Sequence, residues 1–74
     1  MTGRGGEDPP FEVDARGMRC PWPVLRAAKA MRVHAALLIR ADDPIAATEL
    51  EALAAERGWS FVQREAAVFH LRRD

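Results

Sequence analysis

The group best suited to covalent chemistry is the thiol of Cys20, the one cysteine of the 74-residue chain. It stands in Arg19-Cys20-Pro21-Trp22-Pro23, where a strand-like stretch meets an amphipathic one. Because proline is tolerated in the first turn of a helix, Pro21 predicts that Cys20 is the N-cap of a helix. A sulfur at the positive end of a helix dipole is favoured as an anion. The pattern therefore predicts a site that holds a thiolate or a persulfide.

Basic residues strengthen this hypothesis, since Arg16 and Arg19 lie close to Cys20 in the sequence. An electropositive setting is expected to lower the pKa of the Cys20 thiol. Nucleophilicity falls as the pKa falls, so the greater benefit would be to stabilise an anionic persulfide. A free cysteine is often only a buried packing residue, but the position of Cys20 at a helix start favours a reactive role.

A single cysteine has no resolving partner, which excludes dithiol chemistry of the C-x-x-C type within one chain. A relay needs only one sulfur. No His/Cys cluster has the spacing of a metal site, so we expect neither a metal nor a resident cofactor. The intermediate would be a covalent persulfide on Cys20.

Other side chains allow more than one interpretation. A basic helix face of Arg26, Lys29 and Arg32 could dock an acidic partner or could simply be solvated. Trp22 could be a contact anchor or could cover an edge of the core. Asp14 could orient the Arg16 side chain or the turn before Cys20, and the sequence does not decide between these roles.

The remaining titratable residues carry weaker signals. His34 and His70 lack a partner pattern for catalysis or metal binding, and we expect structural or surface roles. Asp42 and Asp43 are better explained by helix capping than by acid–base work.

Composition excludes several classes of function. Eleven basic residues balance eleven acidic ones, so no bulk charge favours nucleic acid or a membrane surface. About half of the residues are hydrophobic, as in a globular domain. The chain shows neither a signal-peptide core nor an apolar run of membrane-spanning length. We expect a cytoplasmic protein, one small domain and a monomer.

Periodicity predicts the elements that must position Cys20. Residues 1–10 have the composition of a flexible tail, and residues 11–74 are expected to form the domain. Strands are predicted at 11–15, 36–39, 59–64 and 67–72, and helices at 21–33 and 44–57, with Gly58 as C-terminal cap. The apolar run 36–39 suggests a strand buried on both faces. The order is βαβαββ, an α+β two-layer sandwich with a mixed four-stranded sheet and both helices on one face.

Two elements of this sequence resemble the TusA/SirA-like sulfur-carrier family. One is Asp14-Ala15-Arg16-Gly17-Met18-Arg19-Cys20-Pro21-Trp22-Pro23-Val24-Leu25, which contains the family's C-P-x-P marker. The other is Ala41-Asp42-Asp43-Pro44, which matches its A-D-D-P marker, and Lys29 matches a basic position between them. The resemblance covers residues 11 to 72 and agrees with the predicted element order.

The resemblance implies that Cys20 accepts sulfane sulfur as a persulfide and passes it to an acceptor protein. Typical donors are cysteine desulfurases or rhodanese-like proteins, and the routes lead to tRNA thiolation, molybdenum cofactor assembly or sulfur oxidation. Pro21 and Pro23 match the presenting motif, while Arg19 and Lys29 match basic positions. The alternative is a non-catalytic interaction module of the same fold. Direct RNA binding is the weaker possibility, because the strands offer few aromatic side chains.

The chain departs from the family pattern at two places. The connection from Met31 to Ala36 is short and lacks the usual Pro-Gly turn. The variable position of C-P-x-P is Trp22, where several relatives carry an acidic or smaller residue. We expect this large side chain near the sulfur to influence which partner proteins bind.

Overall fold

Six elements follow one another in a computed structural model that describes residues 9–73. They are β1 (Phe11–Asp14), α1 (Trp22–Ala30), β2 (Ala36–Arg40), α2 (Ala46–Arg57), β3 (Ser60–Glu65) and β4 (Val68–Arg72). The predicted βαβαββ order is confirmed. Of the predicted flexible tail, residues 1–8 lie outside the described residues. No helix in the described part of the chain is long and apolar enough to cross a membrane.

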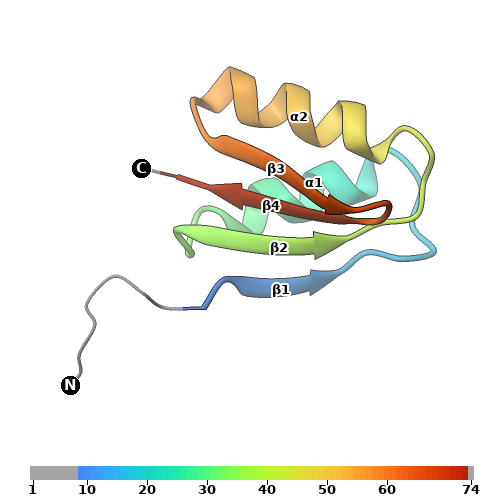
Figure 1. Ribbon diagram of the computed structural model, residues 1–74, viewed down its shortest axis with the longest axis horizontal. Coiled ribbons are helices and arrows are strands. Elements are labelled where there is room, and N and C mark those ends of the chain that lie inside the picture. The colour runs from blue at the N-terminus through green and yellow to red at the C-terminus, as the bar shows by residue number, and fades with distance from the viewer. Residues whose placement is uncertain (1–8, 74) are drawn as a thin grey trace.

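The strands form one mixed sheet in the order β1-β2-β4-β3. β1 and β2 run parallel, whereas β4 is antiparallel to both of its neighbours. Both helices cover the same face of this sheet, which leaves the other face open (Figure 1). The two-layer α+β architecture expected from the sequence is therefore confirmed.

The core lies between the sheet and the helices. Its largest fully buried side chains are Phe69, Met31, Leu37, Ile39, Leu50, Leu71 and Pro23. In β2, Leu37 and Ile39 are buried while Ala36 and Leu38 remain partly exposed. The expectation that β2 is buried on both faces was wrong, because the helices cover only one side and burial alternates along the strand.

The connection between α1 and β2 is held by two contacts with distant segments. α1 ends at Ala30, three residues before the predicted end, and a turn follows it. In that connection the His34 ring stacks on Phe11, with ring centroids 3.9 Å apart. Arg73 Nη1 donates a 2.7 Å hydrogen bond to the carbonyl oxygen of Met31. These contacts fix a segment that has no glycine turn.

The ends of α2 and of the hairpin follow local chemistry. Gly58 terminates α2 with φ of 76°, and the Trp59 amide donates to the Ala54 carbonyl, as in a Schellman motif. This confirms the predicted cap. β3 and β4 then form the predicted antiparallel hairpin, with a register shift between Gln63 and Glu65. β3 begins and ends one residue later than predicted, and β4 begins one residue later.

Candidate functional site

Cys20 is exposed in the loop that joins β1 to α1. The N-cap of α1 is Pro21, and the helix begins at Trp22. The prediction that Cys20 is the N-cap was wrong, since the thiol lies one residue before it. Cys20 nevertheless follows the carboxyl end of a parallel strand, the edge of the sheet where ligand chemistry is commonly found in open α/β sheets.

The start of α1 offers little stabilisation to an anion. Pro21 and Pro23 have no amide hydrogen, and the Trp22 amide donates at 2.9 Å to the Arg19 carbonyl. The amides that usually bind an anion at a helix N-terminus are thus missing or occupied at these three positions. The motif therefore sets the direction of the chain at Cys20. It does not supply a set of free amides that could bind an anion.

The Cys20 loop is attached to the segment before α2 by two aspartates. Asp43 Oδ2 accepts a 2.7 Å hydrogen bond from the Cys20 amide, and Asp42 Oδ1 accepts one of 2.9 Å from the Gly17 amide. Gly17 has φ of 84°, a conformation that glycine adopts without strain. The A-D-D-P segment before α2 therefore holds the cysteine loop in position through these two hydrogen bonds.

Asp43 also shapes the start of α2, although not as the expected cap. The N-cap of α2 is Ile45, which has no side-chain cap, and the helix begins at Ala46 rather than at Pro44. Asp43 Oδ1 accepts a 3.1 Å hydrogen bond from the Ile45 amide. The bonds from Cys20 and Ile45 hold the pKa of the Asp43 carboxyl below its ordinary value. One carboxylate thus joins the cysteine loop to α2.

Asp14 fulfils both of the roles that the sequence left open. Its Oδ1 accepts from the Arg16 backbone amide at 3.1 Å and from Arg16 Nε at 2.8 Å. Its Oδ2 accepts from Arg16 Nη2, also at 2.8 Å. These bonds hold the pKa of Asp14 far below its ordinary value. The Arg16 guanidinium is therefore paired with Asp14. The hydrogen bond from the Arg16 amide to the same carboxylate shapes the turn before Cys20.

The pKa of the Cys20 thiol lies above its ordinary value, so the predicted lowering was wrong. Neighbouring protein atoms remove part of the thiol's hydration, and the carboxylates of Glu49 and Asp43 add negative charge that disfavours the thiolate. Of the two nearby arginines, Arg16 is paired with Asp14, and the charge of Arg19 acts on Asp43. The resting thiol is therefore held in its neutral form.

Glu49 is a site residue that sequence reasoning missed. It lies in the first turn of α2, and its amide donates to the Ile45 carbonyl at 3.1 Å. The amphipathic pattern places Glu49 outside the apolar arc, which is typical of a solvated position. Only the packing of the Cys20 loop against α2 brings the carboxylate to the thiol.

The other residues predicted for the site include exposed side chains of α1. Trp22, two residues after Cys20, is 59% exposed and is not among the side chains that pack against the core. Arg26 and Lys29 are exposed on α1. A hollow of about 500 Å³ adjoins Cys20 and is lined by Gly17, Met18, Arg19, Asp42, Asp43 and Pro44. The described residues include no group of three His, Cys, Asp or Glu side chains placed to hold a metal ion.

Comparisons with known proteins agree with this arrangement. A family model described as Sulfurtransferase TusA matches residues 11–72. A protein of Archaeoglobus fulgidus named "Putative sulfur carrier protein" is 40% identical over 57 residues, which cover 73% of this chain and 74% of that protein. The crystal structure of a SirA-like protein from Desulfitobacterium hafniense superposes with a TM-score of 0.64 and 27% identity, covering 82% of this chain and 90% of the other.

The fold and the site define a class of small α+β proteins that present one exposed thiol on a short loop between the first strand and the first helix. The chain belongs to the TusA family of sulfurtransferases and sulfur carriers. The resemblance seen in the C-P-x-P and A-D-D-P elements is thereby confirmed at the level of the family.

Proposed function

We propose that this protein accepts sulfane sulfur on Cys20 as a persulfide and relays it to an acceptor protein. The observation that carries the proposal is the position of Cys20, the one cysteine of the chain, exposed on a loop that Asp43 attaches to α2. Exposure lets two different protein partners reach the sulfur in turn. The attachment limits the motion of the loop, so each partner meets the thiol in a similar position.

Loading requires the neutral thiol to lose its proton first. Glu49, whose carboxylate lies close enough to the thiol to raise its pKa, takes that proton in our scheme. The Cys20 thiolate attacks the terminal sulfur of the donor persulfide, a new S–S bond forms, and the donor's S–S bond breaks. The donor leaves as a thiolate and takes the proton back from Glu49. No net oxidation or reduction accompanies the transfer.

Unloading repeats the same exchange in the opposite sense. An acceptor thiolate attacks the outer sulfur of the Cys20 persulfide, and the bond between that sulfur and Cys20 breaks. Glu49 first takes the proton of the acceptor thiol, and Cys20 leaves as a thiolate that then receives this proton from Glu49. Since one sulfur suffices for both steps, the scheme needs neither a second cysteine nor a resident cofactor.

The expected partners are a cysteine desulfurase or rhodanese-like donor and a downstream acceptor in tRNA thiolation, molybdenum cofactor assembly or sulfur oxidation. Trp22 and the basic residues Arg26 and Lys29 are proposed to contact them, because all three are exposed on α1, the helix that follows the cysteine loop. A cytoplasmic location and a monomeric state fit this scheme.

The test is to incubate the protein with a cysteine desulfurase and cysteine, or with thiosulfate and a rhodanese, and to measure its intact mass. We expect a gain of one sulfur atom that dithiothreitol reverses and that Cys20→Ser abolishes. A wild-type protein that gains no sulfur from either donor system would overturn the proposal.

The exposure of Trp22 also supports a second candidate, a non-catalytic interaction module. In that case Cys20→Ser would leave partner binding and cellular function intact, whereas Trp22→Ala or Lys29→Glu would abolish them. Complementation with these three variants separates the two functions.

A further inference from the structure

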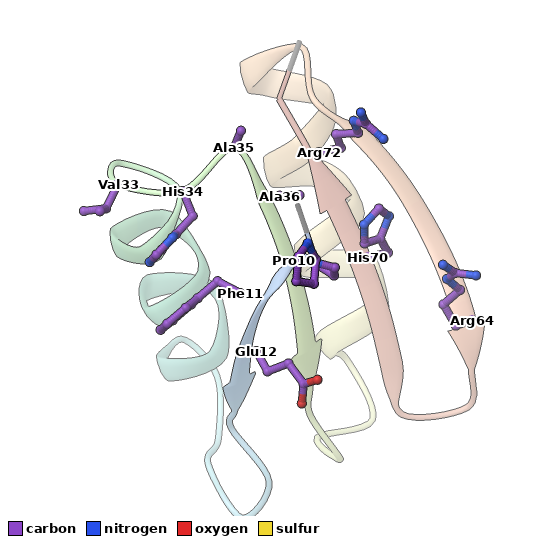
Figure 2. Close-up of a pocket in the computed structure, with 11 residues that line it drawn as sticks. Pro10, Phe11, Glu12, Val33, His34, Ala35, Ala36, Arg64, His70 and Arg72 are labelled. Carbon is purple, nitrogen blue, oxygen red and sulfur yellow. The ribbon is translucent and has the colours of Figure 1, made fainter. Parts of the chain in front are cut away.

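The face of the sheet that the helices leave open carries a groove of about 810 Å³ (Figure 2). One wall consists of residues 9–12, which include the start of β1, and of residues 33–36, which end at the first residue of β2. The other wall consists of Arg64 from β3 and of His70 and Arg72 from β4. We call this feature the sheet groove. It lies on the opposite side of the sheet from α1 and α2.

The three basic side chains of the sheet groove follow the direction of the strands. His70 and Arg72 are two residues apart on β4 and therefore project from the same face, about 7 Å apart along the strand. Arg64 stands at the register shift of β3, beside the other end of β4. Figure 2 shows the three side chains along the same side of the groove. They make a row of basic groups in which two arginine charges flank the imidazole of His70.

No acid forms an ion pair with this row among the residues that the structure describes. The one carboxylate in the lining is Glu12, and its Oε1 already accepts from Arg40 Nη1 at 3.0 Å. Neither Arg64 nor Arg72 forms an ion pair within residues 9–73. Partial burial, followed by the charges of Arg64 and Arg72, lowers the pKa of His70. The same positive field that disfavours the imidazolium attracts an anion.

We propose that the sheet groove docks an extended acidic segment of a partner protein, with carboxylates at alternate residues. Side chains of an extended segment that share a face repeat at about 7 Å, which matches the separation of His70 and Arg72 along β4. A groove that reaches from β1 across the sheet to β3 is broader than one small anion requires. Pro10, which lines the groove, precedes β1, whereas Cys20 follows the end of that strand. The groove and the thiol would therefore contact a partner at different places on the domain.

An acidic peptide suits the groove better than single-stranded RNA does. RNA bases bind by stacking on free aromatic faces. The aromatic rings of the lining, Phe11 and His34, stack on each other with an interplanar angle of 6°. One face of each ring is therefore already covered. The zero net charge of the chain also gives no long-range attraction to a polynucleotide.

The experiment is a titration of the full-length ¹⁵N-labelled protein with a short peptide of alternating Glu and Thr, followed by NMR. We expect chemical-shift changes at Arg64, His70 and Arg72, weaker binding as salt rises, and an upward shift of the pKa of His70 in the complex. The same titration with Cys20→Ser should give the same result, which separates this inference from the proposed function.

Matched variants localise the binding. Replacing Arg64 and Arg72 together by Glu should weaken binding by about tenfold or more. As a matched pair, Arg72→Glu alone should weaken binding, whereas Arg57→Glu, which reverses one charge at the end of α2 in the helix layer, should leave the affinity unchanged. The spectra report whether each variant is folded. Equal binding of a Gln–Thr peptide or of inorganic phosphate, tighter binding of oligouridine, or shift changes confined to α1 would overturn the proposal.

Discussion

The carboxylate of Asp43 accepts a 2.7 Å hydrogen bond from the backbone amide of Cys20, a residue 23 positions away in the chain. Its other oxygen accepts from the Ile45 amide at 3.1 Å. One side chain therefore links the loop that bears the thiol to the segment that starts α2. The relationship explains why a cysteine motif and an acidic motif occur together in one small domain: the second positions the first.

Replacement of Asp43 by Asn should loosen the Cys20 loop. Asn offers one oxygen and one NH₂ group, so at one of the two amides a donor would face a donor. We expect a lower urea midpoint, faster exchange of the Cys20 amide, and slower persulfide loading by a donor. Glu51→Gln, which neutralises an exposed acid on α2, is the matched control and should change none of these three measurements.

The stabilising effect of Asp43 should depend on pH in a defined direction. Its pKa is lowered in the folded state, so the stabilisation is complete above the unfolded value of about 3.9 and is lost as the pH falls through the folded value. The difference in urea midpoint between wild type and Asp43→Asn should therefore be constant near neutrality and should shrink in acid. A difference that grew as the pH fell would contradict the assignment.

Glu49→Gln should lower the pKa of Cys20. The negative charge of the carboxylate raises that pKa, so an uncharged amide disfavours the thiolate less. Alkylation of Cys20 by iodoacetamide near neutral pH should become faster in the variant. Persulfide loading should nevertheless become slower, because the proton acceptor is gone.

The two readouts for Glu49 move in opposite directions, which distinguishes a proton-transfer role from a purely electrostatic one. If alkylation and loading both became faster, Glu49 would act only by suppressing the thiolate. Glu56→Gln, on an exposed part of α2 farther along the helix, should alter neither rate.

Trp22→Ala should weaken the donor complex while leaving the domain folded. The side chain is 59% exposed, so its loss should change the free energy of unfolding by less than about 0.5 kcal/mol. A tryptophan that acts as a binding hot spot contributes about 2 kcal/mol, or roughly thirtyfold in Kd. Calorimetric titration with the donor measures this change. Val62→Ala removes an exposed apolar side chain on β3 and should bind as wild type does.

Much of the fold could be predicted because the controlling interactions are local. The alternation of apolar residues, the helical arc of Ala46, Leu50 and Leu53, and the glycine at position 58 each act within a few residues of chain. The starts of both helices differed from the prediction, and so did the burial of β2. Its continuous apolar run gives no indication that Leu38 lies on a face without a covering layer.

The electrostatics of the site could not be predicted from spacing along the chain. Arg16 and Arg19 are the charged neighbours of Cys20 in sequence, yet their charges act on Asp14 and Asp43. The groups that shift the pKa of the thiol include Glu49, which is distant in sequence and becomes a neighbour only through packing. The C-P-x-P motif identified the reactive atom, whereas its protonation state depends on the tertiary structure.

The stability of the domain should depend heavily on a few buried side chains. A chain of 74 residues buries only about 60% of the surface exposed by its unfolded form, which leaves a small margin of stability. Leu50 is fully buried in α2, so Leu50→Ala should cost about 2–5 kcal/mol through lost apolar contact and the resulting cavity. Leu25→Ala, on the exposed side of α1 at 49% exposure, should cost less than about 1 kcal/mol. Urea unfolding followed by circular dichroism compares the same substitution in the two helices. Similar losses at both positions would show that the sheet–helix interface is not the main source of stability.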